Sequence, residues 1–273
     1  MTSLVNGVAT QHISITDRGL LYGQSLFETI AVADGEPLLL GPHLERLERG
    51  ARVLSIALDE SALLEEIASL AAPIEHGVLR VTLTMGGGGR GYANPSTPHP
   101  LRIVSSHAYP DFDANVYETG IVLGLSDVTL ADQPLLAGHK HGNRLEQIMA
   151  RSRWQDEWQE ALLCGADGGV IEATQSNVFI RNGGQLNTPD LSSAGVAGVM
   201  REFVLNTVDE LGLLAEVVPL SVADIEAADE VFLTNSLIGA WPVRKFQAAE
   251  FNDFTSSQQL LDIMQRDGAI QII

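Results

Sequence analysis

Cysteine, basic residues and long apolar runs are all scarce in this sequence of 273 residues. Cys164 is its only cysteine, which excludes internal disulfides and thiolate-rich metal clusters. No apolar run reaches the roughly 18–20 residues that a membrane-spanning helix needs. The stretch Met1–Gly7 lacks the basic start and apolar core of a signal peptide. From these absences we expect a cytoplasmic protein with no membrane partner.

The charge balance is strongly acidic. Lys and Arg together number 16 against 35 Asp and Glu, giving a formal net charge of -19. Nucleic-acid binding requires a basic face for the phosphates, so we expect no nucleic-acid partner. An anionic small molecule would have to be bound by a few local arginines against the overall field. The hydrophobic fraction of 45% is ample for the core of one large domain or two small ones.

Helical and strand patterns are mixed without strict alternation, which predicts an α+β fold rather than a doubly wound sheet. Asn6-Gly7 and Asp34-Gly35 separate short apolar runs and predict two hairpins. The remaining patterns predict helices at 42–54, 61–70, 144–158, 196–211 and 256–266, and strands at 78–85, 101–107, 121–130, 160–164, 170–172, 177–181, 185–187, 231–234 and 243–246. A change of pattern predicts a small N-terminal domain at 1–108, a linker at 109–115 and a larger C-terminal domain at 116–273.

Lys140 stands out because it lies between two histidines and two glycines, in Gly138-His139-Lys140-His141-Gly142. Asn143 and Glu146 follow at the spacing of a helix N-cap and capping box, which predicts a lysine held on a short loop ahead of a helix. A lysine near other cations loses its proton more easily and can act as a nucleophile or base. The two histidines have no third ligand cluster beside them, so we predict no metal site.

Several other polar residues fall where an anion or a heterocyclic ring could be held. Arg46 lies beside the apolar stripe of the first long helix, and Glu172 ends a short strand. The segment Gly195-Val196-Ala197-Gly198-Val199-Met200-Arg201 is a glycine-rich helix entry, whose exposed N–H groups suit an anion. Asn235-Ser236 end another strand. Each has an ordinary structural interpretation alone, but together with Lys140 they are what pyridoxal phosphate requires.

The glycine run Gly86–Gly89, followed by Arg90 and Tyr92, is not a phosphate loop, because it lacks the Gly-Lys-Ser/Thr ending and no helix pattern follows. A flexible hairpin tip and a mobile active-site loop remain equally good interpretations. A serine-hydrolase site is excluded, because no Gly-x-Ser-x-Gly motif is present.

These motifs resemble those of the fold-type IV pyridoxal-phosphate enzymes, which include branched-chain aminotransferases, D-amino acid aminotransferases and aminodeoxychorismate lyases. The resemblance covers nearly the whole chain, from Asp17-Arg18-Gly19-Leu20-Leu21-Tyr22-Gly23 to Thr234–Val243. It implies a two-domain α+β fold with a small N-terminal α/β domain and a larger, β-barrel-like C-terminal domain with helices. It also implies pyridoxal 5'-phosphate as cofactor and a homodimer.

The resemblance also implies roles for individual residues. Lys140 would hold the cofactor covalently, Glu172 would pair with the pyridine nitrogen, and Arg144 would lie near the phenolic oxygen. The phosphate would be held by Arg46, the backbone of Val199 and Met200, Asn235 and Ser236. Thr29, Arg90, Tyr92 and Tyr109 would contact substrate, the last three reaching across from a second subunit.

Within the family, Lys140-His141-Gly142-Asn143-Arg144-Leu145-Glu146-Gln147 and Gly88-Gly89-Arg90-Gly91-Tyr92 are most similar to the lyase subgroup. The aminotransferases usually carry a tyrosine near the position of Arg144. The resemblance therefore implies conversion of 4-amino-4-deoxychorismate to pyruvate and 4-aminobenzoate, a folate precursor. One alternative is a branched-chain or D-amino acid aminotransferase of the same fold. Another is a non-catalytic binding protein with a degenerate site.

Overall fold

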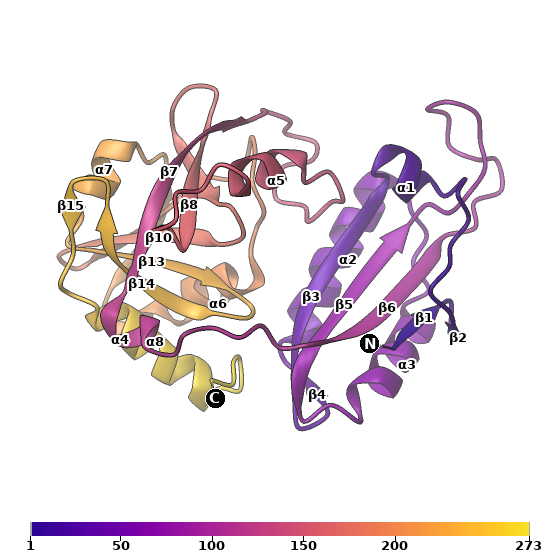
Figure 1. Cartoon of the computed structure of the whole chain (residues 1–273), viewed down its shortest axis with the longest axis horizontal. Coiled ribbons are helices and arrows are strands. Elements are labelled where there is room, and N and C mark those ends of the chain that lie inside the picture. Colours follow the sequence, from indigo (N-terminus) through magenta and orange to yellow (C-terminus); the bar gives the residue numbers. More distant parts are fainter. Residues whose placement is uncertain (1, 273) are drawn as a thin grey trace. The chain divides into compact units, whose positions relative to one another are not determined.

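The computed structural model describes residues 2–272 and divides them into two compact units (Figure 1). One unit comprises the residues up to Asp111 together with the segment His139–Asn143. The other comprises Phe112–Gly138 and the residues from Arg144 onward. Each unit combines a sheet with helices, so the predicted α+β class is confirmed.

The first unit is a six-stranded sheet with two long helices and one short one (Figure 1). Its helices are α1 (Arg18–Tyr22), α2 (Leu40–Leu54) and α3 (Glu60–Ala71). Its strands are β1 (Ser3–Val5), β2 (Val8–Ala9), β3 (Ser25–Ala33), β4 (Glu36–Pro37), β5 (His76–Thr84) and β6 (Leu101–Ala108). They pair antiparallel in the order β2-β1-β6-β5-β3-β4.

The core of this unit lies on one face of the sheet. Leu26 and Ile30 of β3 are buried there against Leu47 of α2 and Leu63 of α3. Side chains alternate between the faces of a strand, so Phe27 and Thr29 must point to the opposite, open face. The single strand β3 therefore supplies residues to both faces.

Both predicted hairpins are present. Asn6 and Gly7, with φ of 46° and 77°, join β1 to β2, and Asp34 and Gly35, with φ of 50° and 83°, join β3 to β4. Two successive positive φ angles define the turn that matches the twist of paired strands. The start of α2 was predicted two residues too late: Pro42 is its third residue, where the missing N–H still costs no helical hydrogen bond.

The second unit is built on a nine-stranded mixed sheet. Its helices are α4 (Val116–Thr119), α5 (Leu145–Arg151), α6 (Val199–Thr207), α7 (Val222–Glu226) and α8 (Thr255–Arg266), with a 3-10 turn η1 (Val208–Leu211). Its strands are β7 (Ile121–Leu130), β8 (Glu160–Gly165), β9 (Val170–Ala173), β10 (Asn177–Asn182), β11 (Gln185–Pro189), β12 (Leu214–Val218), β13 (Glu230–Asn235), β14 (Gly239–Phe246) and β15 (Ala249–Glu250).

This sheet curls on itself. Eight of its strands are hydrogen-bonded in the order β12-β11-β10-β13-β14-β7-β8-β9, and the ninth, β15, pairs with β14 outside this path. The terminal strand β9 returns to pack against β10. The curl encloses a core that includes Val178, Leu233 and Val243. Strand β12 and helices α4 and α7 were not predicted, because they are short and their residues are largely half-buried or exposed. Among residues 2–272, no helix is long and apolar enough to cross a bilayer.

Two helices are shorter than predicted. Helix α5 stops at Arg151 rather than Trp158. Beyond it Trp158 packs against Gly124 of β7, where a Cβ would lie 2.1 Å from the indole ring. Helix α6 begins at Val199 rather than at residue 196 and gives way to η1 at Val208.

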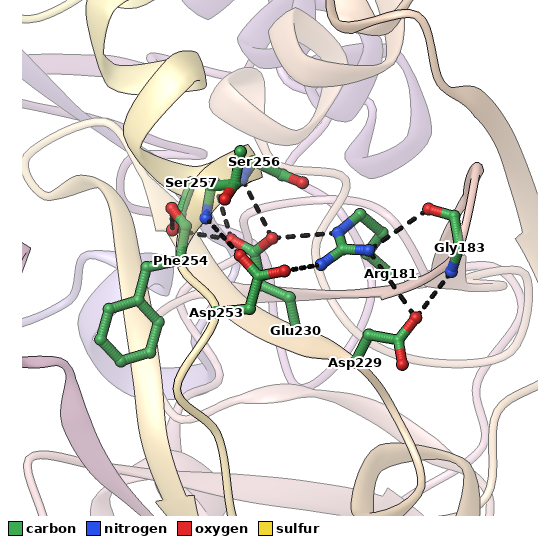
Figure 2. A network of polar contacts seen from close by, with 9 residues as sticks. Arg181, Gly183, Asp229, Glu230, Asp253, Phe254, Ser256 and Ser257 are labelled. Carbon is green, nitrogen blue, oxygen red and sulfur yellow. Dashed lines mark hydrogen bonds and ion pairs between the residues drawn. The ribbon is translucent and has the colours of Figure 1, made fainter.

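A buried carboxylate fixes the start of α8 in the second unit (Figure 2). Glu230 of β13 is fully buried and accepts hydrogen bonds from the backbone N–H of Ser256 and Ser257, at 3.0 and 2.8 Å. Arg181 of β10 donates to it through Nε at 3.2 Å and also pairs with Asp253. The carboxylate thus joins two strands to a helix N-terminus, where negative charge is favourable.

We expect Glu230→Gln to lower the free energy of unfolding by about 3 kcal/mol, because a neutral amide weakens the buried hydrogen bonds to Arg181 and to the N–H groups of Ser256 and Ser257 and brings in an NH2 group that cannot accept them. Urea denaturation measures the change. Glu250→Gln on exposed β15 is the control and should change it by less than about 0.5 kcal/mol. Equal changes in the two variants would contradict a structural role for the network.

Candidate active site

Lys140 is held by the edge of a strand. The N–H of Phe27 donates to the carbonyl of Lys140 at 2.9 Å, and the N–H of Gly142 donates to the carbonyl of Ser25 at 2.8 Å. An isolated antiparallel bridge joins Leu26 to His141 between these two bonds. Residues 140–142 therefore behave as a short extra strand on β3, and this pairing fixes the main chain of the lysine.

The predicted capping box beyond the lysine is wrong. Arg144, and not Asn143, is the residue that precedes the first turn of α5, and its side chain makes no capping hydrogen bond. The Glu146 carboxylate instead accepts from the N–H of Ala131 at 2.9 Å. The position of the lysine comes from strand pairing, which the local sequence does not reveal.

Arg46 lies in a buried polar cluster of the first unit. Its Nε donates to Oε1 of Glu28 at 2.8 Å and its Nη2 to Oε2 at 2.5 Å. Nδ1 of His43 lies 2.7 Å from Oε2 of the same carboxylate. The apolar pattern of α2 predicts a buried stripe of Leu44, Leu47, Ala51 and Leu54; Leu47 and Ala51 are buried as predicted, and Leu44 and Leu54 are half-buried against the same core. The buried face is wider than the stripe, because it also includes His43 and Arg46.

The electrostatics of the cluster define its protonation. Burial alone would raise the pKa of Glu28, but the charge and hydrogen bonds of Arg46, with those of His43, bring that pKa down to about 2. Burial lowers the pKa of His43 despite its bond to Glu28. Near neutral pH the cluster is therefore an ionised Glu28, a neutral His43 and a charged Arg46. The ionised carboxylate can only accept, so His43 donates through Nδ1.

The open face of the sheet places a second cation near the lysine. Nζ of Lys140 lies 4.7 Å from the centre of the Phe27 ring, and the Arg80 guanidinium carbon lies 4.2 Å from the same centre. Half-buried Thr29 is the direct cross-strand partner of Arg80. The sequence interpretation missed Arg80, although a charged residue inside the apolar run Val78–Val81 of a strand was a usable signal.

The glycine run is held by the motif near the N-terminus. Buried Arg18 donates through Nη1 to the carbonyl of Gly91 at 3.0 Å and through Nε to Gln24 at 2.6 Å. Arg90 is exposed, and Tyr92 is 90% exposed, with only an edge contact to Tyr22 within this chain's described residues. Both candidate substrate residues therefore project from a loop whose base is fixed.

Tyr109, the remaining predicted substrate residue, is half-buried at the end of β6. Its ring stacks on His76 with centroids 4.0 Å apart. His76 belongs to β5, so the stack fastens the chain leaving the sheet to the strand beside it. This contact gives Tyr109 a structural role that the sequence did not indicate.

In the second unit, Glu172 of β9 is 5% exposed, and its Oε2 accepts from the N–H of Val196 at 2.8 Å. Gly195 has φ of 84°, and a Cβ there would meet Ile171 at 2.8 Å. Only glycine fits such a position without strain. The loop of 195–197 also pairs with Gly138, two residues before Lys140 in the chain.

The start of α6 faces a polar strand end. Asn177 of β10 donates through Nδ2 to the carbonyl of Val196 at 2.9 Å, and a Cβ on Gly198 would lie 2.0 Å from its Oδ1. Gly198 is the N-cap of α6 and has no side chain to cover the first turn. The N–H groups of buried Val199 and Met200 belong to that turn, where helices attract anions.

The end of β13 lies beside the start of β10, where Thr234 pairs with Asn177. Asn235 builds the turn that follows: its Oδ1 accepts from Leu237 and Ile238, and its Nδ2 donates to the carbonyl of Gln175. The turn presents half-buried Ser236. Thr234 is 1% exposed, and its hydroxyl has no hydrogen-bond partner among the described residues.

A second buried carboxylate supports this region. Glu160 of β8 is 1% exposed and accepts from the N–H groups of Thr174 and Gln175 and from the hydroxyl of Ser176. Burial raises its pKa to about 7, although the hydrogen bonds favour the charged form. Glu160 thus organises the turn between Glu172 and Asn177, and the sequence interpretation missed it.

The chain is similar to known proteins in both sequence and structure. The sequence profile described as Amino-transferase class IV matches residues 25–246. This chain belongs to the class IV aminotransferase family. The matched range includes Arg46, Lys140, Glu172 and Ser236. Among the described residues of this family member, no group of three or more His, Cys, Asp or Glu side chains could hold a metal ion.

Individual members of the family are also similar. The chain is 34% identical to aminodeoxychorismate lyase of Vibrio harveyi over 90% of this chain and 92% of that protein. It superposes on the crystal structure of 4-amino-4-deoxychorismate lyase from Pseudomonas aeruginosa with a TM-score of 0.94 and 41% identity, covering 97% of this chain and 98% of the other. Branched-chain amino acid aminotransferase from Escherichia coli superposes with a TM-score of 0.83 at 20% identity, covering 97% and 92% of the chains.

Glu160 makes stability depend on pH. A folded-state pKa of about 7, against an unfolded value near 4.5, means that the neutral form favours folding and that this contribution is lost as pH rises through 7. Glu160→Gln cannot ionise. Relative to the wild type, its unfolding free energy should therefore improve by about 2 kcal/mol between about pH 5.5 and about pH 8.

Urea unfolding across this range measures the difference. Glu216→Gln on the exposed β12 is the control and should follow the wild type at every pH. A constant offset between Glu160→Gln and the wild type would show that the pKa of Glu160 is not raised.

Proposed function

We propose that this chain is a pyridoxal-phosphate-dependent lyase that converts 4-amino-4-deoxychorismate to 4-aminobenzoate and pyruvate. The observation that carries the proposal is Lys140, fixed on β3 with Arg46 in the same unit, within a chain 41% identical to a lyase over nearly its whole length. The motif Lys140–Gln147, most similar to lyases by sequence, supports the same reaction. A role in folate synthesis follows from the product.

The second unit fits the phosphate and the ring of this cofactor. Thr234 has a buried hydroxyl without a partner among the described residues, and it pairs with Asn177, whose side chain donates to the loop before α6. The hydroxyl of Ser236 and the N–H groups at the start of α6 are donors of the kind that a phosphate requires. Buried Glu172 supplies a carboxylate able to pair with a protonated pyridine nitrogen.

The roles of individual residues rest on the resemblance to the fold-type IV enzymes. Arg46, the N–H groups of Val199 and Met200, and Ser236 would hold the phosphate, while Asn235 shapes the turn that presents Ser236. Arg144 would lie near the phenolic oxygen. When bound, pyridoxal phosphate supplies a carbon that accepts amines and a protonated ring that accepts an electron pair. Lys140 attaches the cofactor and, as a neutral amine, removes the proton from the carbon that bears the substrate nitrogen.

The reaction balances without an added oxidant. Loss of that proton and cleavage of the bond between the ring carbon and the ether oxygen make the remaining ring aromatic and release enolpyruvate. Enolpyruvate then takes up one proton at its methylene carbon and becomes pyruvate, so the proton lost from the ring is balanced. The substrate carries two carboxylates, which an acidic protein must meet with local cations. Arg80 contacts the ring of Phe27, as Lys140 does, and Thr29 is its cross-strand partner. We therefore add Arg80 to Arg90 as a candidate for binding a substrate carboxylate. Tyr92 and Tyr109 remain candidates.

We further propose a cytoplasmic homodimer. Large apolar side chains are exposed in both units, including Ile15, Leu20 and Tyr92 in the first and Leu145 and Ile148 in the second. Contiguous exposed apolar groups, such as Leu145 and Ile148 three residues apart on α5, are typical of surfaces that bind a partner. A second copy of the chain would cover them and let Arg90, Tyr92 and Tyr109 contribute to the partner's substrate site.

The first test concerns the lysine. Lys245 is the only other lysine in the sequence, which provides a matched control. After borohydride reduction, peptide mass spectrometry should find the cofactor on Lys140 in the wild type and in Lys245→Ala. Lys140→Ala should take up no covalent cofactor and lose at least about a thousandfold in rate, as expected when the attacking group is removed. Cofactor on Lys245, or an active Lys140→Ala protein, would refute the assignment.

The competing activity is amino transfer, which needs the same lysine and cofactor. The likeness to the E. coli aminotransferase, at 20% identity, shows the fold alone. An aminotransferase converts its cofactor to the aminated form with an amino donor alone, and the visible absorption disappears. We expect the holoenzyme's spectrum to stay unchanged with branched-chain or D-amino acids. Rapid loss of the visible absorption with either class of amino acid would contradict the lyase and favour an aminotransferase.

A further inference from the structure

Glu28 occupies an unusual place for a carboxylate. Its side chain lies on the core face of β3, between Leu26 and Ile30, and it is only 1% exposed. An ionised carboxylate in such surroundings is unfavourable unless it is paired and hydrogen-bonded. Arg46 and His43 meet that need, but apolar residues of similar volume in place of a buried ion pair often give a protein of equal or greater stability. The cluster therefore has a purpose other than packing.

The geometry of the pair fixes the guanidinium of Arg46. Its Nε and Nη2 each meet a different oxygen of Glu28, at 2.8 and 2.5 Å, so the planar group cannot rotate or tilt. A guanidinium has five N–H donors in a rigid fork, so fixing two determines the direction of the other three. Glu28 is itself fixed by Nδ1 of His43, whose Nε2 is buried without a partner among the described residues.

We propose that Glu28 is a positioning residue that aims Arg46 at the phosphate arm of the cofactor and so sets the affinity for the phosphorylated form of that cofactor. The inference rests on the proposed function, in which Arg46 binds the phosphate. Glu28 itself touches neither the cofactor nor the substrate in this scheme; it acts only through the arginine. His43 completes the arrangement by holding the carboxylate from a third side.

A competing effect has the opposite sign, which makes the idea testable. Glu28 is a negative charge near a phosphate site, and through space it should repel the phosphate. If charge dominated, Glu28→Gln would bind the phosphate roughly tenfold more tightly. If the orientation of Arg46 dominates, Glu28→Gln binds the phosphate more weakly, because displacing a fixed group by about 1 Å can cost roughly a hundredfold. We expect the loss of orientation to exceed the loss of repulsion, so that the affinity for the phosphate falls by about tenfold.

The experiment compares two cofactor forms on the apo-protein. Pyridoxal 5'-phosphate and pyridoxal both attach to the lysine, and only the first has a phosphate. We define the phosphate preference as the dissociation constant of pyridoxal divided by that of pyridoxal 5'-phosphate, both measured by absorption titration. This ratio reports the contribution of the phosphate to binding. The variants are Glu28→Gln, which removes the charge, Glu28→Asp, which keeps the charge but shortens its reach, and Arg46→Gln.

Glu66→Gln is the matched control. Glu66 is 6% exposed and pairs with Arg102 at 2.8 Å in the same unit, so breaking it damages an equivalent buried pair away from the lysine. Both it and Glu28→Gln should lower the melting temperature. The Glu28 variants should reduce the phosphate preference by about tenfold, whereas Glu66→Gln should leave it unchanged. The double variant Glu28→Gln with Arg46→Gln should have the same phosphate preference as Arg46→Gln alone.

The outcomes separate the two layers of the proposal. If Arg46→Gln leaves the ratio unchanged, Arg46 does not bind the phosphate and the proposed function loses that assignment. If Arg46→Gln lowers the ratio but the Glu28 variants leave it unchanged or raise it, the positioning role alone is refuted. Should Glu28→Gln fail to fold, Glu28→Asp decides: an unchanged ratio refutes the role, and a reduced ratio with an intact charge supports it.

Discussion

The pairing of residues 140–142 with the edge of β3 is the constraint on which the candidate site of the first unit depends. It places the main chain of Lys140 opposite Phe27, one residue from Glu28. Glu28 pairs with Arg46 on the core face of the strand. On the open face, the ring of Phe27 contacts both the Lys140 amine and the Arg80 guanidinium. One strand therefore sets the lysine and both arginines in register. A slip of one residue would exchange its two faces and separate all three.

In the second unit the buried carboxylates are held mainly by groups other than arginine. The chain has few basic residues, and its buried carboxylates rely largely on N–H and hydroxyl donors. Glu172 accepts from Val196, and Glu160 accepts from the turn at 174–176. Glu230 combines one arginine with the first N–H groups of α8. Backbone donors hold acidic side chains in place without using the arginines that an anionic ligand needs.

The sequence predicted what depends on local chemistry. Asn6-Gly7 and Asp34-Gly35 form the expected turns, and most strands lie where the apolar patterns place them. Where the predictions were wrong, tertiary contacts overruled a local signal. Asn143 looked like an N-cap, but the segment 140–142 is drawn into pairing with a strand more than a hundred residues earlier in the chain. Helix α5 was predicted too long because the packing of Trp158 on Gly124 is not a periodic signal.

The roles of Glu28 and Glu160 could not be predicted from the residues around them in the sequence, since each depends on a partner from another element. The proposed reaction is tested most directly by supplying the holoenzyme with 4-amino-4-deoxychorismate, without any 2-oxo acid, and quantifying both products over many turnovers. We expect equal amounts of 4-aminobenzoate and pyruvate, with Lys140→Ala forming neither. A requirement for an added 2-oxo acid, or release of one product without the other, would contradict it.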